Sequence, residues 1–228
     1  VTSATPPAAF RRMGMWLLLA SLGMLFGATL VGFLVLRLRA EQWPPPGTPP
    51  LPGGLWVSTG LLMVLSLGLV LAARAARAGK GRELNRMLGV SFLLALAFLV
   101  SQGSNWMRMV ADDVLPDQRL LVWFFYLLTI LHAAHVLFGL VPLALVAFRG
   151  RAVRYTPDDL EAIHLVGLYW QFLLVNWVGI IVSLFICVLP PIRYSILDPQ
   201  FSTRPPGKVS MGGMTYRYDA YSIQHPVS

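Results

Sequence analysis

Five long apolar runs alternate with short polar connections along the 228 residues of this chain. Each run is long enough to cross a bilayer as a helix, which takes about 20 apolar residues. The predicted spans cover residues 13–36, 55–73, 88–107, 120–148 and 163–189. The sequence therefore predicts an all-α fold, an integral membrane bundle of five transmembrane helices.

The polar segments divide the chain into three parts. Residues 1–12 form an N-terminal tail, residues 13–189 the bundle, and residues 190–228 a polar C-terminal tail without hydrophobic periodicity. The proline-rich stretch 44–52 is typical of extended polyproline II. Pro157, followed by two acids, predicts that a helix begins before the fifth apolar run. Two interpretations of the C-terminal tail stay open: a flexible segment, or a strap across the outer surface of a partner.

Composition supports the membrane assignment. Hydrophobic residues make up 56% of the chain and charged residues 12%, whereas soluble domains carry about 25% charged residues. A soluble enzyme and a disordered chain are both excluded by this balance. The ten acids, which all lie outside the predicted spans, are Glu41, Glu83, Asp112, Asp113, Asp117, Asp158, Asp159, Glu161, Asp198 and Asp219. The basic residues lie in short clusters between the apolar runs, so the net charge of +8 does not indicate nucleic-acid binding.

The basic residues also predict how the bundle is oriented. Ten lie in the N-terminal tail and in the loops after the second and fourth spans: Arg11, Arg12, Arg74, Arg77, Lys80, Arg82, Arg86, Arg149, Arg151 and Arg154. The loops on the other side hold four: Arg37, Arg39, Arg108 and Arg119. By the positive-inside rule, the N-terminus is expected in the cytoplasm and the C-terminus outside.

Ionisable groups inside a membrane usually mark function, and the predicted spans contain no Asp, Glu, Lys or Arg. His132 and His135 are three residues apart on one helix face. A metal site would need further ligands from other spans, so we expect the two histidines to form hydrogen bonds to neighbouring helices. Gln102 and Asn105 are expected to join helices in the same way. The sequence thus predicts no catalytic centre and no metal site, and favours one subunit of a larger membrane complex.

Four segments resemble subunit III of the haem–copper oxidases, the cytochrome c and quinol oxidases. The fourth span contains HAAHVLFG, from His132 to Gly139, similar to the family's H-G-x-H-V-x-x-G. The fifth contains GLYWQFLLVNW, starting at Gly167, similar to G-L-Y-W-H-F-V-D-V-V-W. The first contains GMW, ending at Trp16, similar to L-G-M-W, and the third ends in QGSNW, similar to L-Q-x-x-E-W. The four occur in the family's order.

The departures from the family pattern concern polar positions. The family's Glu in the first span falls at Leu22, and its Glu in the third at Asn105. In the fifth span its His falls at Gln171 and its Asp at Leu174. Family roles for an acid of this subunit in proton uptake therefore do not carry over, whereas the histidine pair of the fourth span matches.

The resemblance implies a non-redox accessory subunit of a respiratory terminal oxidase in the cell inner membrane. Such a subunit packs on the catalytic subunit I, in a complex with subunit II, and holds phospholipid in a cleft between its helices. Haem and copper are then expected in the partner subunits, where electron transport, O2 reduction and proton pumping take place. The motif residues, expected to be structural, lipid or subunit contacts, are Trp16, Gln102, Trp106, His132, His135, Gly139, Tyr169, Trp170 and Trp177.

Three other functions are weighed against this interpretation. The nearest is an accessory subunit of a nitric oxide reductase, which the loss of the acids favours. A small membrane cytochrome would use His132 or His135 as an axial ligand to haem. A solute transporter predicts an inverted repeat, which five spans of unequal length do not show.

Overall fold

The computed structural model describes residues 8–39, 51–114, 120–149 and 157–188, and in the C-terminal segment residues 207–211, 214–219 and 222–223. The chain divides into two compact units, Val1–Val188 and Leu189–Ser228. Most of the proline-rich stretch 44–52 lies outside the described residues.

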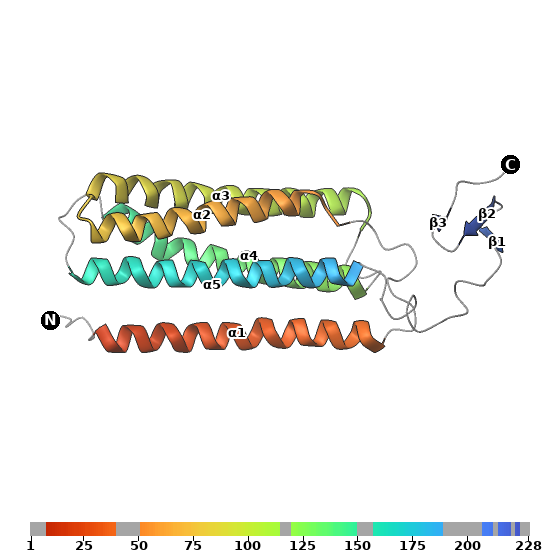
Figure 1. The fold of residues 1–228 in the computed structure, drawn as a ribbon, viewed down its shortest axis with the longest axis horizontal. Coiled ribbons are helices and arrows are strands. Elements are labelled where there is room, and N and C mark those ends of the chain that lie inside the picture. The colour runs from red at the N-terminus through yellow and green to blue at the C-terminus, as the bar shows by residue number, and fades with distance from the viewer. Residues whose placement is uncertain are drawn as a thin grey trace. The chain divides into compact units, whose positions relative to one another are not determined.

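Five helices form the first unit, and each is long and apolar enough to cross a membrane (Figure 1). They are α1 (Ala8–Arg39), α2 (Gly54–Arg77), α3 (Gly81–Ala111), α4 (Leu120–Arg149) and α5 (Pro157–Val188). The predicted fold class, an all-α membrane bundle, is confirmed for this unit. α5 begins at Pro157, where the sequence predicted a helix start.

The helices are longer than the apolar runs, because their first and last turns also include polar and charged residues. Arg37 and Arg39 lie in the last turn of α1, and Glu83 lies in the first turn of α3. Each charge has the sign that the helix dipole favours at that end. Apolar runs alone therefore underestimate helix length.

α2 and α3 pack along each other as an antiparallel pair. Their tight connection includes Gly79 at φ +70°, a left-handed conformation that suits glycine. The Lys80 amide donates to the carbonyl of Ala75 at 2.9 Å, which closes the end of α2. α5 contacts α1, α2 and α4, whereas α1 packs mainly on α5 and touches α4 least. α1 is therefore the least embedded helix of the bundle.

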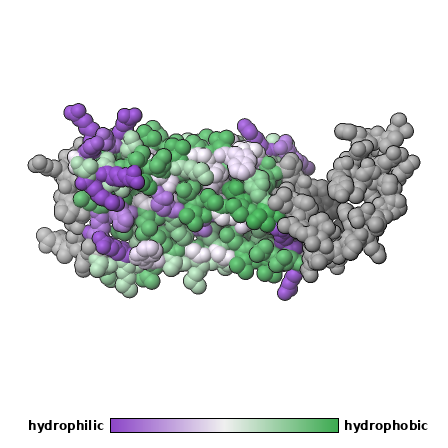
Figure 2. Space-filling view, in the orientation of Figure 1, coloured by the Kyte–Doolittle hydropathy of each residue, from purple (hydrophilic) through white to green (hydrophobic). Residues whose placement is uncertain are grey.

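The interior of the bundle is aromatic and aliphatic. The largest fully buried side chains include Trp170, Trp177, Phe26, Phe33 and Phe98. Large apolar residues also cover the outer surface, which Figure 2 shows as green over the middle of the bundle with hydrophilic residues toward its ends. An apolar exterior is expected where lipid replaces water as the solvent.

The C-terminal unit contains three short antiparallel strands in the order β1-β2-β3. They are β1 (Gly207–Met211), β2 (Met214–Asp219) and β3 (Ser222–Ile223), and Met211 pairs with Met214. The sequence analysis did not predict them, although a Gly-Gly pair between two strands is typical of a two-residue hairpin connection. Whether the segment is flexible or acts as a strap stays a prediction.

Candidate functional site

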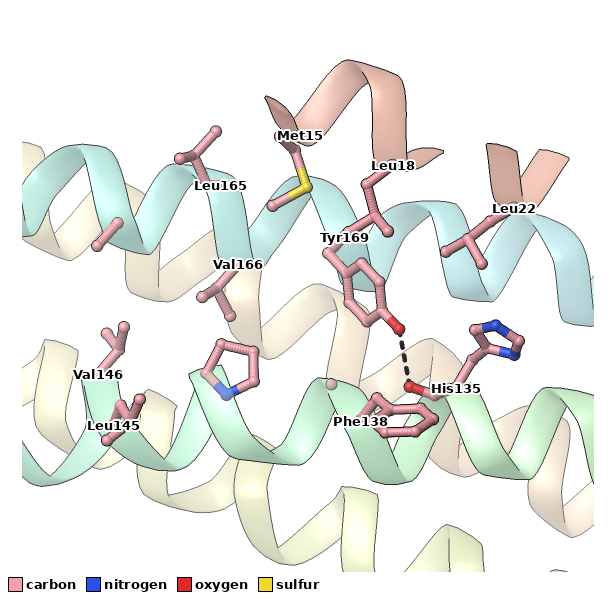
Figure 3. Close-up of a pocket in the computed structure, with 13 residues that line it drawn as sticks. Met15, Leu18, Leu22, His135, Phe138, Leu145, Val146, Leu165, Val166 and Tyr169 are labelled. Atoms are coloured by element: carbon pink, nitrogen blue, oxygen red, sulfur yellow. Dashed lines mark hydrogen bonds between the residues drawn. The ribbon is translucent and has the colours of Figure 1, made fainter. Parts of the chain in front are cut away.

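A cleft of about 590 Å³ lies between α1, α4 and α5 (Figure 3). Thirteen residues line it: Met15, Leu18 and Leu22 of α1, His135, Phe138, Gly139, Pro142, Leu145 and Val146 of α4, and Ala162, Leu165, Val166 and Tyr169 of α5. His135 and Tyr169 are the polar members of this lining. Such a surface suits an apolar ligand.

Gly139 sets how closely α4 and α5 approach below the cleft. A Cβ atom at this position would lie 2.6 Å from Cε1 of Tyr169 and 3.3 Å from Cζ2 of Trp170. The space of the missing side chain is therefore filled by the two α5 rings. The Tyr169 hydroxyl donates to the backbone carbonyl of His135 at 2.8 Å, so α4 and α5 are also joined by a hydrogen bond (Figure 3).

The two α4 histidines have different surroundings. His135 is half-buried, and its Nδ1 lies 2.7 Å from the carbonyl oxygen of Leu131 in the same helix. Since a carbonyl oxygen only accepts, Nδ1 carries the proton of this bond. The His135 ring also meets the ring of Phe26 edge-on, with centroids 5.3 Å apart. His135 thus presents its ring to α1 and the cleft.

His132 is fully buried among aromatic rings. Its ring centroid lies 4.9 Å from that of Trp177, 5.7 Å from Phe98 and 6.3 Å from Phe26. Neither ring nitrogen has a hydrogen-bond partner within the described part of the chain. Among the described residues, neither histidine ring forms the predicted hydrogen bond to a neighbouring helix. The ring of His132 packs against aromatic rings, and the ring of His135 forms a hydrogen bond to the carbonyl of Leu131 in its own helix.

Gln102 joins α2 to α3, as the sequence predicted. Its Oε1 accepts from the Ser58 hydroxyl at 3.1 Å and from the Asn105 amide at 2.9 Å. Ser58 and Ser101 share a further hydrogen bond of 2.9 Å between their hydroxyls. Gln102 and Asn105 are both buried, so this polar cluster fixes the two helices relative to each other.

Two tryptophans and one glutamine form further contacts between helices. The indole N–H of Trp177 donates to Thr59 at 3.0 Å, and that of Trp106 donates to Thr129 at 3.1 Å. Gln171 and Ser66 exchange two hydrogen bonds, since the Ser66 hydroxyl donates to Oε1 at 2.6 Å and Nε2 donates to the Ser66 carbonyl at 3.2 Å. α5 is therefore joined to α2 through polar side chains.

The nine motif residues do not converge on one site. His135, Gly139 and Tyr169 lie at the cleft, whereas Gln102 belongs to the α2–α3 interface. Trp16 is 62% exposed on the surface of α1. Within the described ranges, no group of three or more His, Cys, Asp or Glu residues could hold a metal ion. The absence of a metal from this chain stays a prediction.

Sequence reasoning missed an ion-pair cluster beside the cleft. Glu161, which is 9% exposed, accepts from Nη2 of Arg11 at 2.7 Å and from Nε of Arg12 at 2.8 Å. The apolar segment of α5 that is long enough to span a membrane is Leu160–Ile186, so Glu161 lies at its start. Two arginines compensate its charge, which allows an apolar helix to include it. The adjacent Arg11-Arg12 pair was the available signal.

Comparison with known proteins adds to these observations. Residues 8–188 match the family model described as Cytochrome c oxidase subunit III. A probable cytochrome c oxidase subunit 3 of Nocardia farcinica is 26% identical over 164 residues, which cover 71% of this chain and 80% of the relative. The cytochrome c oxidase subunit 3 of Synechocystis sp. is 26% identical over 181 residues, covering 77% and 75%. That of Alkalihalophilus pseudofirmus is 29% identical over 169 residues, covering 74% and 82%.

Proposed function

The chain belongs to the cytochrome c oxidase subunit III family, and from this premise we propose that it packs on the catalytic subunit I of a respiratory terminal oxidase. It is a multi-pass membrane protein and an accessory subunit of a haem–copper oxidase, acting in a complex with catalytic subunits. The observation that carries this function is the family match, because it includes all five helices. Subunit II is a further proposed partner.

In this proposal the redox centres lie in the partner subunits. The packing of His132 supports this, because rings of Phe26, Phe98 and Trp177 surround it on three sides. A haem iron would need an open approach to one ring nitrogen and a second ligand on its opposite face. The surroundings of His132 therefore argue against this residue as a haem ligand.

The proposed role of the cleft is to hold a phospholipid. Its apolar lining matches an acyl chain, and α1 forms one wall without closing it. A bound lipid would fill the space between α1 and α4, which contact each other less than the other neighbouring helices do. It would therefore stabilise the position of α1. Leu18 lines this wall and is 47% exposed.

Filling the cleft tests the lipid proposal. In the purified complex, Leu18→Trp is expected to reduce the phospholipid retained, as counted by native mass spectrometry. Leu25→Trp is the matched control, since Leu25 is 46% exposed on the same helix and does not line the cleft. Equal lipid retention in both variants would overturn the assignment of the cleft.

The proposed location is the cell inner membrane, with the N-terminus in the cytoplasm. Figure 1 places the start of α1, the α2–α3 turn and the start of α5 at one end of the bundle. Most basic residues of the described helix ends and connections in the bundle lie at that end, which supports a cytoplasmic position. Protease cleavage of an N-terminal tag only after inner-membrane vesicles are turned cytoplasmic side out would support this orientation.

Purification from native membranes tests the assignment to an oxidase. An affinity-tagged chain is expected to co-purify with a haem-containing subunit I in a complex that reduces O2. A chain that purifies without any haem-containing partner would overturn the proposal. A haem partner that reduces nitric oxide and not O2 would assign the chain to a nitric oxide reductase instead.

A further inference from the structure

The C-terminal sheet lies beyond the part of the chain that carries the family assignment. The family match ends at residue 188, whereas the three strands lie between Gly207 and Ile223. The sheet is therefore an addition to the five-helix bundle of the family. Its pattern of residues needs an explanation apart from the role that the bundle shares with its relatives.

The register of the sheet separates apolar from polar residues. Successive residues of a strand lie on opposite faces, and directly paired residues lie on the same face. One face holds a glycine and six apolar or tyrosine residues: Gly207, Val209, Met211, Met214, Tyr216, Tyr218 and Ile223. The other face holds polar and charged residues: Lys208, Ser210, Thr215, Arg217, Asp219 and Ser222. The separation is complete along all three strands.

A single layer of three strands cannot cover its own apolar face. Stable domains consist of at least two packed layers of secondary structure. Among the described residues of this unit, the three strands are the only elements. An antiparallel sheet with one apolar and one polar face is typical of a sheet that packs on one side and meets water on the other. The apolar face therefore requires a second surface.

The open edges of the sheet favour a protein surface over the hydrocarbon of the bilayer. β1 and β3 are the edge strands, and an edge strand carries unpaired N–H and C=O groups. In hydrocarbon these groups would have no hydrogen-bond partner. Tyrosine and methionine occupy four of the six apolar positions, and both are enriched at protein–protein interfaces. The face therefore fits a protein.

The connection to α5 favours a partner in the same complex. Residues 189–206 join Val188 to Gly207, and a segment of this length can span up to about 60 Å. Packed helices lie about 8–10 Å apart, so the sheet can reach past several helices. Its apolar face is small beside the roughly 20–30 residues that each side of a stable interface contributes. Tethering compensates for this small area inside an assembled complex, because docking is then intramolecular.

We propose that the C-terminal sheet docks its apolar face on the extramembrane surface of a partner subunit in the same oxidase complex. Tyr216 and Tyr218 stand at the centre of that contact, and the face with Lys208 and Arg217 stays in water. The inference rests on the proposed function, because it requires an oxidase partner. It assigns an added contact between subunits to residues that lie outside the family match.

Photo-cross-linking in the full complex tests which face docks. Tyr216→p-benzoylphenylalanine and Thr215→p-benzoylphenylalanine are compared after irradiation in native membranes. Thr215 is the matched control, because it precedes Tyr216 on β2 and lies on the polar face. A cross-link to a partner subunit is expected from position 216 and not from position 215. The aromatic replacement at position 216 keeps the apolar face intact.

Protease sensitivity gives a second measurement on the same complex. Tyr216→Ala is expected to raise the rate of tryptic cleavage after Lys208 about tenfold, because losing one buried aromatic side chain lowers the docked population by about that factor. Thr215→Ala should leave the rate unchanged. Equal rates in the two variants would overturn the proposal.

The cross-linked products distinguish the other occupants of the apolar face. Cross-links to lipid alone, to a second copy of this chain, or equally from both positions would each overturn the proposal. If a haem-containing partner co-purifies and position 216 labels no subunit, docking fails and the oxidase assignment stands. If no haem-containing partner co-purifies, the oxidase assignment fails and the inference fails with it.

Discussion

The two sides of the bundle are held together in different ways. α2 and α3 are connected by a tight turn and by a buried polar cluster around Gln102, and α5 joins them through Thr59 and Ser66. α1, by contrast, is tied to α5 by the ion pairs of Glu161 at one end and packs elsewhere through apolar contacts such as Phe26. The cleft opens on this second side.

The difference supports the proposed position of the lipid in the cleft. Polar side chains that satisfy one another need fixed distances, so they hold α2, α3 and α5 in one arrangement. Apolar contacts have no such directional requirement, and a lipid can replace part of them. The cleft lies beside α1 because this helix is held by ion pairs at one end and by apolar contacts along the rest of its length.

The largest effect on stability is expected from Trp177→Ala, on the side of the bundle where polar side chains join α2, α3 and α5; we call this the closed side. Trp177 is fully buried, donates to Thr59, and contacts His132 and Phe98. Truncating a buried tryptophan costs about 3–5 kcal/mol, measured as the free energy of unfolding in detergent. Val175→Ala is the control, because Val175 is exposed on the same helix. Similar losses of unfolding free energy in the two variants would show that the contacts of Trp177 do not stabilise the closed side.

A smaller effect is expected from Gly139→Ala below the cleft. The added methyl group would lie 2.6 Å from the Tyr169 ring and force α4 and α5 apart, at about 1–3 kcal/mol. Gly27→Ala is the control, since nothing lies within 4 Å of a Cβ there. Thermal unfolding should separate the two variants, and a stabilised Gly139→Ala would contradict the observed close packing.

Gln102→Leu tests the polar cluster of the closed side. Ser58 and Asn105 would lose their shared acceptor, and hydrogen bonds between membrane helices are worth about 0.6–2 kcal/mol. Chemical unfolding in detergent is expected to show a loss in that range. A neutral result would mean that apolar packing alone holds α2 against α3.

The smallest effect is expected from His132→Leu. Because His132 makes no hydrogen bond to the described residues, an apolar side chain of similar size should leave the free energy of unfolding within about 1.5 kcal/mol of wild type. The haem spectrum of the purified complex should be unchanged as well. Loss of a haem band in this variant would show that His132 is a haem ligand.

Local sequence signals predicted much of this architecture. Five apolar runs predicted five helices, Pro157 predicted the start of α5, and Gln102 was expected to join helices. Each of these inferences depends on residues that are close in sequence or on one strong physical requirement. In lipid, backbone and side-chain polar groups must form their hydrogen bonds within the protein.

Other features depend on contacts between distant residues. Glu161 pairs with Arg11 and Arg12 from 150 and 149 positions away, so its role is invisible until α1 lies against α5. The surroundings of His132 likewise come from three other helices. The cleft itself is a gap between helices, and a gap has no sequence pattern of its own.

The most direct test of the account compares the oxidase complex purified with and without this subunit. We expect the same haem absorption spectrum and the same initial rate of O2 reduction per haem, because we propose that the redox centres lie in the partner subunits. The complex that lacks the subunit should lose activity faster during turnover, because its stabilising partner and bound lipid are missing. Loss of a haem band together with the subunit would contradict the account.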